Sequence, residues 1–351
     1  MEEKEEIFFY GSLHNHTDYS NLRLRDSINK LPDLIDRAIE LGHTVVGITE
    51  HETTSNSIKA EKYYRKIKKK NPNFKVVLGN EVYLCRNGLN SSNFIKGVDK
   101  YYHFCLYALD GIGHEQIREI STRAWGRSYK TRNTRRVPTY YQDLVDIIKS
   151  NPGHVVGSSA CLGGALPTQL IRMRDGTDMM LMDKIIRWCE QMEDIFGKDN
   201  FFLELQPSAS KEQTYVNRQL IDLSKKLEIP YIITTDSHYL KKEEAKIHKA
   251  YLNSQNGDRE VDSFYATTYM MDTEELESHL QLSKEELEYG YTNIKKIADR
   301  CEDFTLLKPL KMPQLKWKDN KVFSKQLLEK YFVYMPELRT CYNSSNEGDR
   351  S

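Results

Sequence analysis

Short apolar runs alternate with longer amphipathic stretches from the N-terminus to about residue 255. This alternation predicts βα units around a mainly parallel sheet or barrel, because parallel strands need helical crossovers between them. One amphipathic stretch, Leu31 to Ile39, has apolar residues at helical spacing, and Gly42 after it is expected to cap the helix. Seven runs are predicted to be strands, at residues 7–13, 44–49, 75–84, 102–109, 154–158, 201–205 and 230–235.

Composition restricts the class of protein and its partners. The 351 residues are 39% hydrophobic, enough for a globular core, and 51 Lys and Arg balance 51 Asp and Glu. A nucleic-acid partner would therefore need a local basic patch. The apolar runs are strand-sized, the acidic start MEEKEE lacks a secretory segment, and the six cysteines form no CxxC pair. We expect a cytoplasmic protein with no membrane partner.

The pattern changes after Asp258, where helices are predicted at 273–280 and 284–301. From Lys316 the sequence is polar, and its end, NSSNEGDRS, has a composition typical of disorder. We expect three parts: a barrel domain at 1–258, a helical extension at 259–315 and a polar, partly disordered tail at 316–351.

Side chains able to bind a metal recur at the C-terminal ends of the predicted strands, where β/α barrels build active sites. His14 and His16 follow the first strand two residues apart, so both can face one cation. The last strand ends in Asp236 and His238, again two residues apart. The intervening strands contribute His51, Glu81, His103 and Cys161. These donor types favour zinc and its transition-metal neighbours, and a shared carboxylate allows two or three ions in one cleft.

Each of these residues alone has an ordinary structural explanation. A lone histidine near a strand end is more often a hydrogen-bonded structural residue, and Cys161 alone would be a small core residue. Chance placement of so many donors at successive strand ends is far less expected. Five histidines lack this placement and are interpreted as structural, with His248 as a candidate support for a ligand: His43, His114, His154, His248 and His279.

The motifs LHNHTDYS, GITEH, LGNEVYL, SSACLGG, FFLELQP and TTDSHYL, in this order and spacing, resemble the polymerase-and-histidinol-phosphatase (PHP) domain. More narrowly, they resemble its version at the N-terminus of the bacterial DNA polymerase III α subunit, over about Phe8 to Leu315. The resemblance implies an α/β fold, a distorted seven-stranded (β/α)7 TIM-like barrel with a C-terminal helical extension. Seven strands are also what the apolar runs predict.

The resemblance further implies nine metal ligands and two or three divalent ions of zinc, manganese or iron. The first site would comprise His14, His16, Glu81 and Asp236, the second Glu81, His103 and Cys161, and the third Asp26, His51 and His238. For Asp26, a role as the N-cap of a helix at 28–39 is an equally weighted alternative. Glu50 stands where the family usually has Asp, and we expect no direct metal contact from it.

Clustered divalent ions would bind phosphate oxygens and lower the pKa of a bridging water to about 7. As the shared carboxylate, Glu81 would set the spacing of the ions, and we assign catalytic roles to Glu81, Asp236 and His16. A serine or cysteine nucleophile is not required, and the sequence has no GxSxG motif.

Two segments are rich in basic residues, and one of them is a candidate for nucleic-acid contacts. Residues 121–138, STRAWGRSYKTRNTRRVP, carry no acidic residue and include Trp125 and Tyr129. Charge mixed with aromatic faces suits phosphates and unstacked bases, so we expect this segment to bind single-stranded DNA, with a solvated loop as the alternative. Its basic residues are Arg123, Arg127, Lys130, Arg132, Arg135 and Arg136. The run KAEKYYRKIKKK at 59–70 is interpreted as a solvated helix face.

Three hypotheses of function follow. The first is a metal-dependent phosphodiesterase, a 3′ to 5′ exonuclease on single-stranded or mismatched DNA ends that proofreads for a replicative polymerase, with polymerase or replisome subunits as partners. The second is a phosphomonoesterase on a small phosphorylated metabolite. The third is a non-catalytic docking module. The sequence contains no DxD and little length after Leu315, so we expect no polymerase activity. A fragment of a larger polymerase and a free-standing relative both remain open.

Overall fold

The computed structural model describes residues 8–131, 134–176, 181–254, 264–309, 320–337 and 339. The chain divides into two units, residues 1–306 and 307–351. The first unit carries the sheet and every candidate metal ligand. In the second unit the described residues include one α-helix, α11 (Asn320–Tyr334), within the segment predicted to be a polar tail. In the described part of the chain, no helix is both long and apolar enough to cross a membrane.

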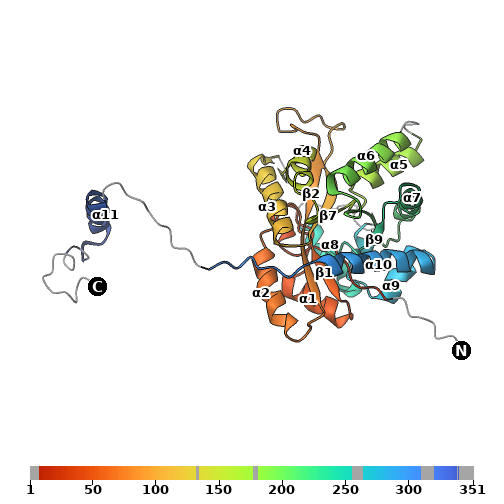
Figure 1. Ribbon diagram of the computed structural model, residues 1–351, viewed down its shortest axis with the longest axis horizontal. Helices are drawn as coiled ribbons and strands as arrows, with labels where there is room; N and C mark the ends of the chain where they lie inside the picture. The colour runs from red at the N-terminus through yellow and green to blue at the C-terminus, as the bar shows by residue number, and fades with distance from the viewer. Residues whose placement is uncertain are drawn as a thin grey trace. The chain divides into compact units, whose positions relative to one another are not determined.

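A curled sheet of seven strands lies at the centre of the first unit (Figure 1). Its order is β1 (Val45–Ile48), β2 (Lys75–Cys85), β3 (Tyr102–Ala108), β7 (Val155–Ser158), β8 (Phe201–Leu205) and β9 (Tyr231–Ile233), with short β6 (Thr139–Tyr140) on β2. Strand β3 runs antiparallel to both its neighbours, and the other pairs are parallel. Six of the seven predicted ranges coincide with these strands.

The first predicted strand, at 7–13, is not a regular strand among the described residues. Residues 10–15 run beside β1, where the backbone nitrogens of Val45 and Gly47 donate to the carbonyls of Tyr10 and Ser12 at 3.1 and 2.9 Å. Gly11 has φ +131°, which only glycine adopts readily and which breaks the regular ladder. The structure therefore shows an α/β fold with a curled sheet and does not confirm a closed seven-stranded TIM-like barrel.

Helices pack around this sheet and bury its strands (Figure 1). Helix α1 (Leu31–Glu40) illustrates why, because its apolar residues recur at helical spacing and are buried on one face. As predicted, Gly42 follows its end with φ +77°. The other helices of six residues or more are α2 (Ser57–Lys68), α3 (Gly111–Gly126), α5 (Ala165–Arg174), α6 (Leu181–Phe196), α7 (Lys211–Leu227), α8 (Ala245–Asn253), α9 (Thr273–Leu280) and α10 (Lys284–Arg300).

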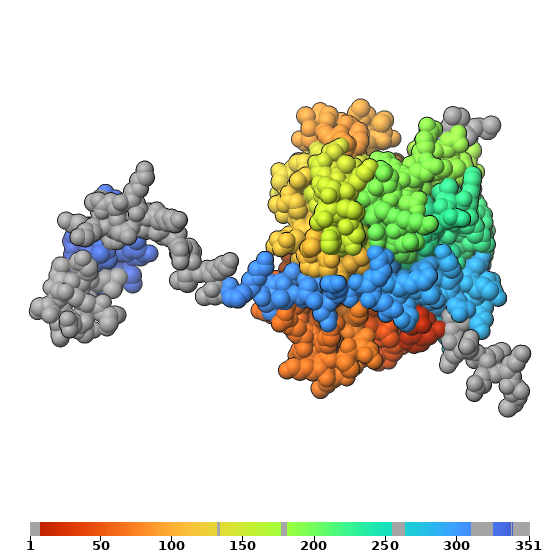
Figure 2. All heavy atoms as spheres, viewed as in Figure 1, coloured from red at the N-terminus to blue at the C-terminus, as the bar shows by residue number. Residues whose placement is uncertain are grey.

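The C-terminal part of the first unit crosses one face of the molecule as a band (Figure 2, blue). Helix α10 packs on β9, where the Asn293 amide donates to the Tyr231 carbonyl at 2.9 Å. The chain then continues past the end of β3, with Glu302 N donating to the Leu109 carbonyl at 2.7 Å. Leu306 N reaches a Glu61 carboxylate oxygen on α2 at 2.7 Å. These bonds tie the segment after the last strand to β9, to the end of β3 and to helix α2.

Candidate metal centre

The candidate ligands meet at one edge of the sheet. His51, Cys161 and Asp236 each lie in the turn that follows a strand, as the parallel pattern predicts. His103 is the second residue of β3, and it reaches the same edge because β3 runs antiparallel to its neighbours. Glu81 lies in the middle of β2, which extends beyond this edge. The cluster therefore depends on the direction in which each strand runs, and not only on residues that follow the C-terminal ends of strands.

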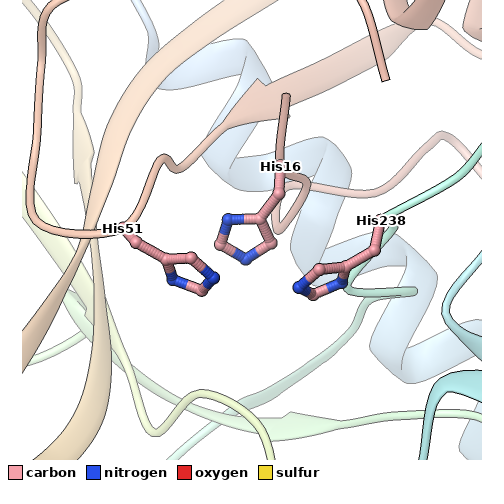
Figure 3. Close-up of side chains that lie close together, drawn as sticks. All are labelled: His16, His51 and His238. Atoms are coloured by element: carbon pink, nitrogen blue, oxygen red, sulfur yellow. The ribbon is translucent and has the colours of Figure 1, made fainter. Parts of the chain in front are cut away.

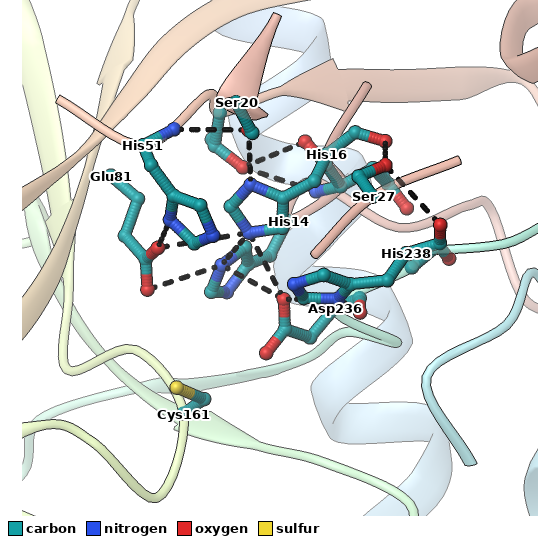
Figure 4. Close-up of polar contacts among 12 residues, drawn as sticks. His14, His16, Ser20, Ser27, His51, Glu81, Cys161, Asp236 and His238 are labelled. Carbon is teal, nitrogen blue, oxygen red and sulfur yellow. Dashed lines mark hydrogen bonds and ion pairs between the residues drawn. The ribbon is translucent and has the colours of Figure 1, made fainter. Parts of the chain in front are cut away.

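The first predicted group converges closely (Figure 4). The Nε2 atoms of His14 and His16 lie 3.1 Å apart, and each lies within 3.3 Å of Asp236 Oδ1. Glu81 carboxylate oxygens are 3.6 and 3.7 Å from the same two nitrogens. All four side chains are buried.

Glu81 also belongs to the second group. Its Oε1 lies 2.8 Å from His103 Nδ1, and Cys161 Sγ lies 3.3 Å from that nitrogen. His103 has the most exposed side chain of the three, at 24%, whereas Cys161 and Glu81 are buried. The second group therefore marks the side of the cluster that is open to solvent.

The third group joins Asp26, His51 and His238. Asp26 Oδ2 lies 2.9 Å from His51 Nε2 and 3.6 Å from His238 Nε2. The rings of His51 and His238 lie on either side of His16 (Figure 3), with centroids 4.1 and 4.5 Å from its own. The N-cap alternative for Asp26 is wrong, because α1 begins at Leu31 with Lys30 at its N-cap.

The side chains present fit divalent cations. Among the candidate ligands, four carboxylate oxygens are buried without a hydrogen-bond partner in the described part of the chain: Asp26 Oδ1, Glu81 Oε1 and Oε2, and Asp236 Oδ1. Histidine nitrogens lie close to the Glu81 oxygens, with His51 Nδ1 2.5 Å from Oε2 and His103 Nδ1 2.8 Å from Oε1. Buried, unsatisfied carboxylates are costly, and bound cations would satisfy them. Imidazole, carboxylate and thiol are also the donor set that transition metals prefer.

Two of the candidate ligands have pKa shifts that favour the forms able to bind a cation. Burial, reinforced by the charges of His51 and His238, lowers the pKa of His16 to about 3, so its imidazole is neutral. Burial opposes ionisation of Glu81, but the charges of His103 and His51 outweigh it and hold the pKa of Glu81 well below its usual range. A neutral imidazole and an ionised carboxylate are the forms that bind a cation.

Backbone strain accompanies three of the turns that carry candidate ligands. Asp236 itself has φ +48°, Ala160 before Cys161 has φ +55°, and Glu52 after His51 has φ +54°. Non-glycine residues in this left-handed region cost about 1–3 kcal/mol each, so the surrounding structure must hold them there.

Sequence reasoning missed Glu204, which lies within the cluster. This residue of β8 lies with Oε1 2.7 Å from His14 Nδ1, the ring nitrogen that points away from His16. Gln206 and Thr234 donate to the same oxygen at 2.9 and 2.6 Å. A carboxylate that holds the far nitrogen of a metal-binding histidine fixes its ring and tautomer. The sequence did contain an indication of this role, because FFLELQP places the acidic residue Glu204 inside an otherwise apolar predicted strand.

Tyr83 and Arg23 were also missed. The Tyr83 ring stacks on His103 with centroids 4.3 Å apart, and its hydroxyl lies 3.2 Å from His51 Nδ1. The Arg23 guanidinium lies 5.0 Å from the Tyr83 ring centroid and pairs with buried Glu52. Burial outweighs the Arg23 charge and raises the pKa of Glu52 to about 8.

Glu50, from which no metal contact was expected, accepts hydrogen bonds from Thr17, Ser20 and Asn56. It therefore secures the turn that follows His16. Of the five histidines interpreted as structural, His248 adjoins the site, with Nε2 2.5 Å from the Asp26 carbonyl oxygen. His154 lies 2.6 Å from Asp110. His43 and His114 are buried, and His279 is not among the cluster residues.

The basic segment at 121–138 does not present all of its charge to solvent. Arg123 and Arg127 lie near the end of α3 and pair with carboxylates, including Asp146 at 3.3 Å and Asp143 at 2.6 Å respectively. Trp125 donates to the Glu52 carbonyl at 2.6 Å, and the Tyr129 hydroxyl lies 2.5 Å from that of Tyr101.

Three further basic residues, Lys130, Arg135 and Arg136, belong to a small hairpin of β4 (Tyr129–Lys130) and β5 (Arg135–Arg136). Lys130 and Arg135 are exposed, and Arg136 lies over the Tyr101 ring. Arg132 lies outside the described residues. The hairpin adjoins the cluster through Arg23, which donates to Thr134 Oγ1 at 2.9 Å.

Fold and site together define an α/β protein with a buried histidine–carboxylate cluster at the edge of a curled sheet. Comparison with known families gives this class a name: residues 12–208 match the PHP domain. The chain belongs to the PHP domain family.

Relatives with curated sequences include DNA polymerases. The chain is 34% identical over 353 residues to the DNA-directed DNA polymerase of Bacillus phage SPbeta, which covers 96% of this chain and 27% of that protein. It is 28% identical over 310 residues to the DNA polymerase III subunit alpha of Borreliella burgdorferi, covering 85% of this chain and 24% of that protein. The chain thus spans about a quarter of the length of these relatives. A candidate metal-dependent phosphoesterase from Bifidobacterium adolescentis superposes with a TM-score of 0.43 at 12% identity, covering 83% of this chain and 96% of that one.

Proposed function

We propose that this chain is a metal-dependent phosphoesterase and that its substrate is a phosphodiester at a DNA 3′ end. The observation that carries the proposal is the convergence of nine side chains able to bind a metal. Four of their buried carboxylate oxygens have no hydrogen-bond partner within the part of the chain that the structure describes. A purely structural polar cluster would be expected to satisfy its own hydrogen bonds.

Each group has an assigned task in the proposal. His14, His16, Glu81 and Asp236 hold the first ion; Glu81, His103 and Cys161 hold the second; Asp26, His51 and His238 hold the third. Bound divalent ions supply positive charge that polarises phosphate oxygens and makes water more acidic. Glu81 lies between the groups and orients them, and Glu204 fixes the His14 ring. Substrate approaches from the side of His103, the open side of the cluster.

The DNA substrate is supported by the relatives, which are DNA polymerases. We propose that the chain acts as a 3′ to 5′ exonuclease in the cytoplasm, on single-stranded or mismatched ends, in association with a replicative polymerase. The exposed hairpin residues Lys130 and Arg135, with Arg136, lie near the cluster and are proposed to contact the strand.

The test is metal analysis combined with hydrolysis. We expect two or three transition-metal ions per chain after purification without chelator and reconstitution with zinc or manganese. We also expect release of nucleotides from a 3′-labelled single strand, lost on chelation and restored by metal. Less than one ion per chain would refute the metal centre. Hydrolysis of a phosphorylated metabolite in preference to DNA would favour a phosphomonoesterase, and DNA binding without turnover would favour a docking module.

A further inference from the structure

A groove beside the cluster combines positive charge with aromatic rings. It lies between the turn after His16 and helices α1 and α2, and has a volume of about 580 Å³. Its lining includes four lysines, two tyrosines and one acidic residue: Lys30, Lys59, Lys62, Lys66, Tyr19, Tyr63 and Asp18. Asp18 is paired with Lys30 at 2.6 Å, so the charge of the three α2 lysines is not balanced within the groove.

The three α2 lysines form one exposed row. Lys59, Lys62 and Lys66 are spaced three and four residues apart, which places them on the same face of the helix. Within the described residues none of them pairs with a carboxylate. Lys59 lies over the Tyr19 ring at 5.0 Å and Lys66 over the Tyr63 ring at 5.8 Å. By contrast, Arg123 and Arg127 of the predicted DNA-binding segment are held by carboxylates.

One wall of the groove adjoins the metal cluster through the buried residue Ser20. Its wall includes Leu22 of the turn η1 (Ser20–Leu22) and Tyr19, the residue that precedes this turn. Ser20 Oγ lies 2.9 Å from His16 Nδ1. The backbone nitrogen of His51 also donates to Ser20 Oγ at 3.1 Å. The lining residue Tyr19 therefore directly precedes Ser20, whose hydroxyl contacts two candidate metal ligands.

We propose that this groove binds the backbone of single-stranded DNA and leads it to the metal cluster, an inference that rests on the proposed function for its end point. Regularly spaced ammonium groups suit successive phosphates, and half-exposed tyrosine rings give bases a surface on which to stack. An acidic peptide would use the charge but not the rings. The run at 59–70 is thus a binding face rather than only a solvated one.

The test compares three triple variants that each remove three positive charges. The groove variant is Lys59→Ala, Lys62→Ala, Lys66→Ala; the hairpin variant is Lys130→Ala, Arg135→Ala, Arg136→Ala; the control is Lys211→Ala, Lys225→Ala, Lys226→Ala on α7, which lies well away from α2 in Figure 1. Binding of a fluorescent 15-nucleotide dT strand is followed by anisotropy at several salt concentrations with the metal-loaded protein. A gel confirms that the strand is intact.

We expect the groove variant to bind about tenfold more weakly and to lower the salt slope by about 2, at roughly 0.7 per lost phosphate contact. The α7 control should match the wild type, and a Lys→Arg triple at the groove positions should restore the slope. A groove variant that matches the α7 control, or loss confined to the hairpin variant, would overturn the proposal. The proposal would also be overturned if polyglutamate displaced the fluorescent strand as strongly as unlabelled dT of equal charge.

The binding readout separates this proposal from the proposed function. A slope change in the groove variant, together with a wild type that hydrolyses no phosphoester, would support the groove and refute the enzyme. If the wild type hydrolyses a phosphoester and the groove variant has the same salt slope as the α7 control, the proposed function is supported and the groove proposal is refuted. Thermal melting of each variant establishes that it is folded, and the three groove lysines are exposed, so their removal should not unfold the protein.

Discussion

At the scale of single residues, the candidate centre depends most on Glu81. Its carboxylate lies between the groups, and both of its oxygens lack a hydrogen-bond partner among the described residues. Four histidine nitrogens lie within 3.7 Å of it, from His14, His16, His51 and His103. Asp26 contacts only the third group, so the two acidic residues should differ in importance.

We predict that Glu81→Gln lowers phosphoesterase activity by more than about 100-fold. Loss of a residue that only hydrogen-bonds a metal ligand costs about 10- to 100-fold, and Glu81 is proposed to bind the ions itself. Asp26→Asn should cost about tenfold, because it affects one ion. Activity and metal content of both variants check this, at matched ion concentrations. Equal losses, or an active Glu81→Gln enzyme, would show that the assignment of groups is wrong.

Glu204→Gln should weaken metal binding by about 10- to 100-fold, because a neutral amide orients His14 less strongly than a carboxylate. Titration with a competing chelator measures the affinity directly. Glu212→Gln, on the exposed start of α7, is a matched control that should leave the affinity unchanged. An unchanged affinity in Glu204→Gln would mean that Glu204 only fills the core.

His43 gives a pH-dependent test of stability far from the candidate ligands. Its ring packs edge-on against Phe9, and burial, with the charge of Arg37, lowers the pKa of His43 to about 4, whereas Asp272 acts in the opposite sense. The unfolded chain takes up a proton at about pH 6.5, which the folded chain excludes until about pH 4, so stability falls as pH falls through that window.

We therefore expect the free energy of unfolding of the wild type to fall, relative to that of His43→Gln, by about 3 kcal/mol between pH 7 and pH 4. Denaturant unfolding of both proteins across this range measures the difference. Parallel pH profiles for the two proteins would contradict a neutral His43 in the folded state.

At the scale of elements, close backbone contact explains how an irregular segment joins the sheet. Residues 10–15 approach β1 so closely that a Cβ at Gly47 would lie 1.8 Å from the Leu13 carbonyl oxygen. A side chain there would push away the segment that carries His14 and His16. The glycine in the middle of β1 is therefore required by a neighbour far away in the sequence.

Gly47→Ala should destabilise the protein by about 3 kcal/mol, because the obstacle is backbone and cannot rotate away. Gly126→Ala, at the end of α3, is the control: a Cβ there meets nothing within 4 Å, and alanine favours a helix by up to about 1 kcal/mol. Thermal or denaturant unfolding compares the two. A Gly47→Ala protein as stable as the control would show that the segment can move away without cost.

At the scale of the first unit, the buried cluster couples folding to metal binding. The ligands come from segments between residues 14 and 238, and four of their carboxylate oxygens have no hydrogen-bond partner among the described residues. Ions that bind only the folded chain stabilise it by mass action.

Removal of the ions should therefore lower the melting temperature by about 5 °C or more, since binding at about 100 times Kd contributes about 2.7 kcal/mol. Calorimetry with and without chelator, followed by addition of zinc or manganese, measures the loss and its recovery. Chelation should lower the melting temperature of the Glu81→Gln protein by less than that of the wild type. An unchanged melting temperature, once elemental analysis shows the ions are gone, would indicate that the cluster does not need them.

The sequence by itself determined the βα pattern, six of the seven sheet strands and the positions at which donor side chains leave them. Those features are local: apolar spacing marks a strand, and a histidine pair two residues apart projects to one side whatever lies around it. The family likeness assigned the nine ligands to groups, and the structure brings the side chains of each group together.

Only the tertiary structure decided the rest, because direction, burial and charge balance depend on partners distant in sequence. The antiparallel course of β3 brings His103 to the site from the start of its strand. Glu204 contacts His14, 190 residues away, which no local pattern reveals. Folding pairs Arg127 of one basic run with Asp143, whereas Lys59, Lys62 and Lys66 of the other have no carboxylate partner among the described residues. A basic side chain can bind a ligand only if folding has not already paired it with a carboxylate, and the sequence alone does not show which side chains are paired.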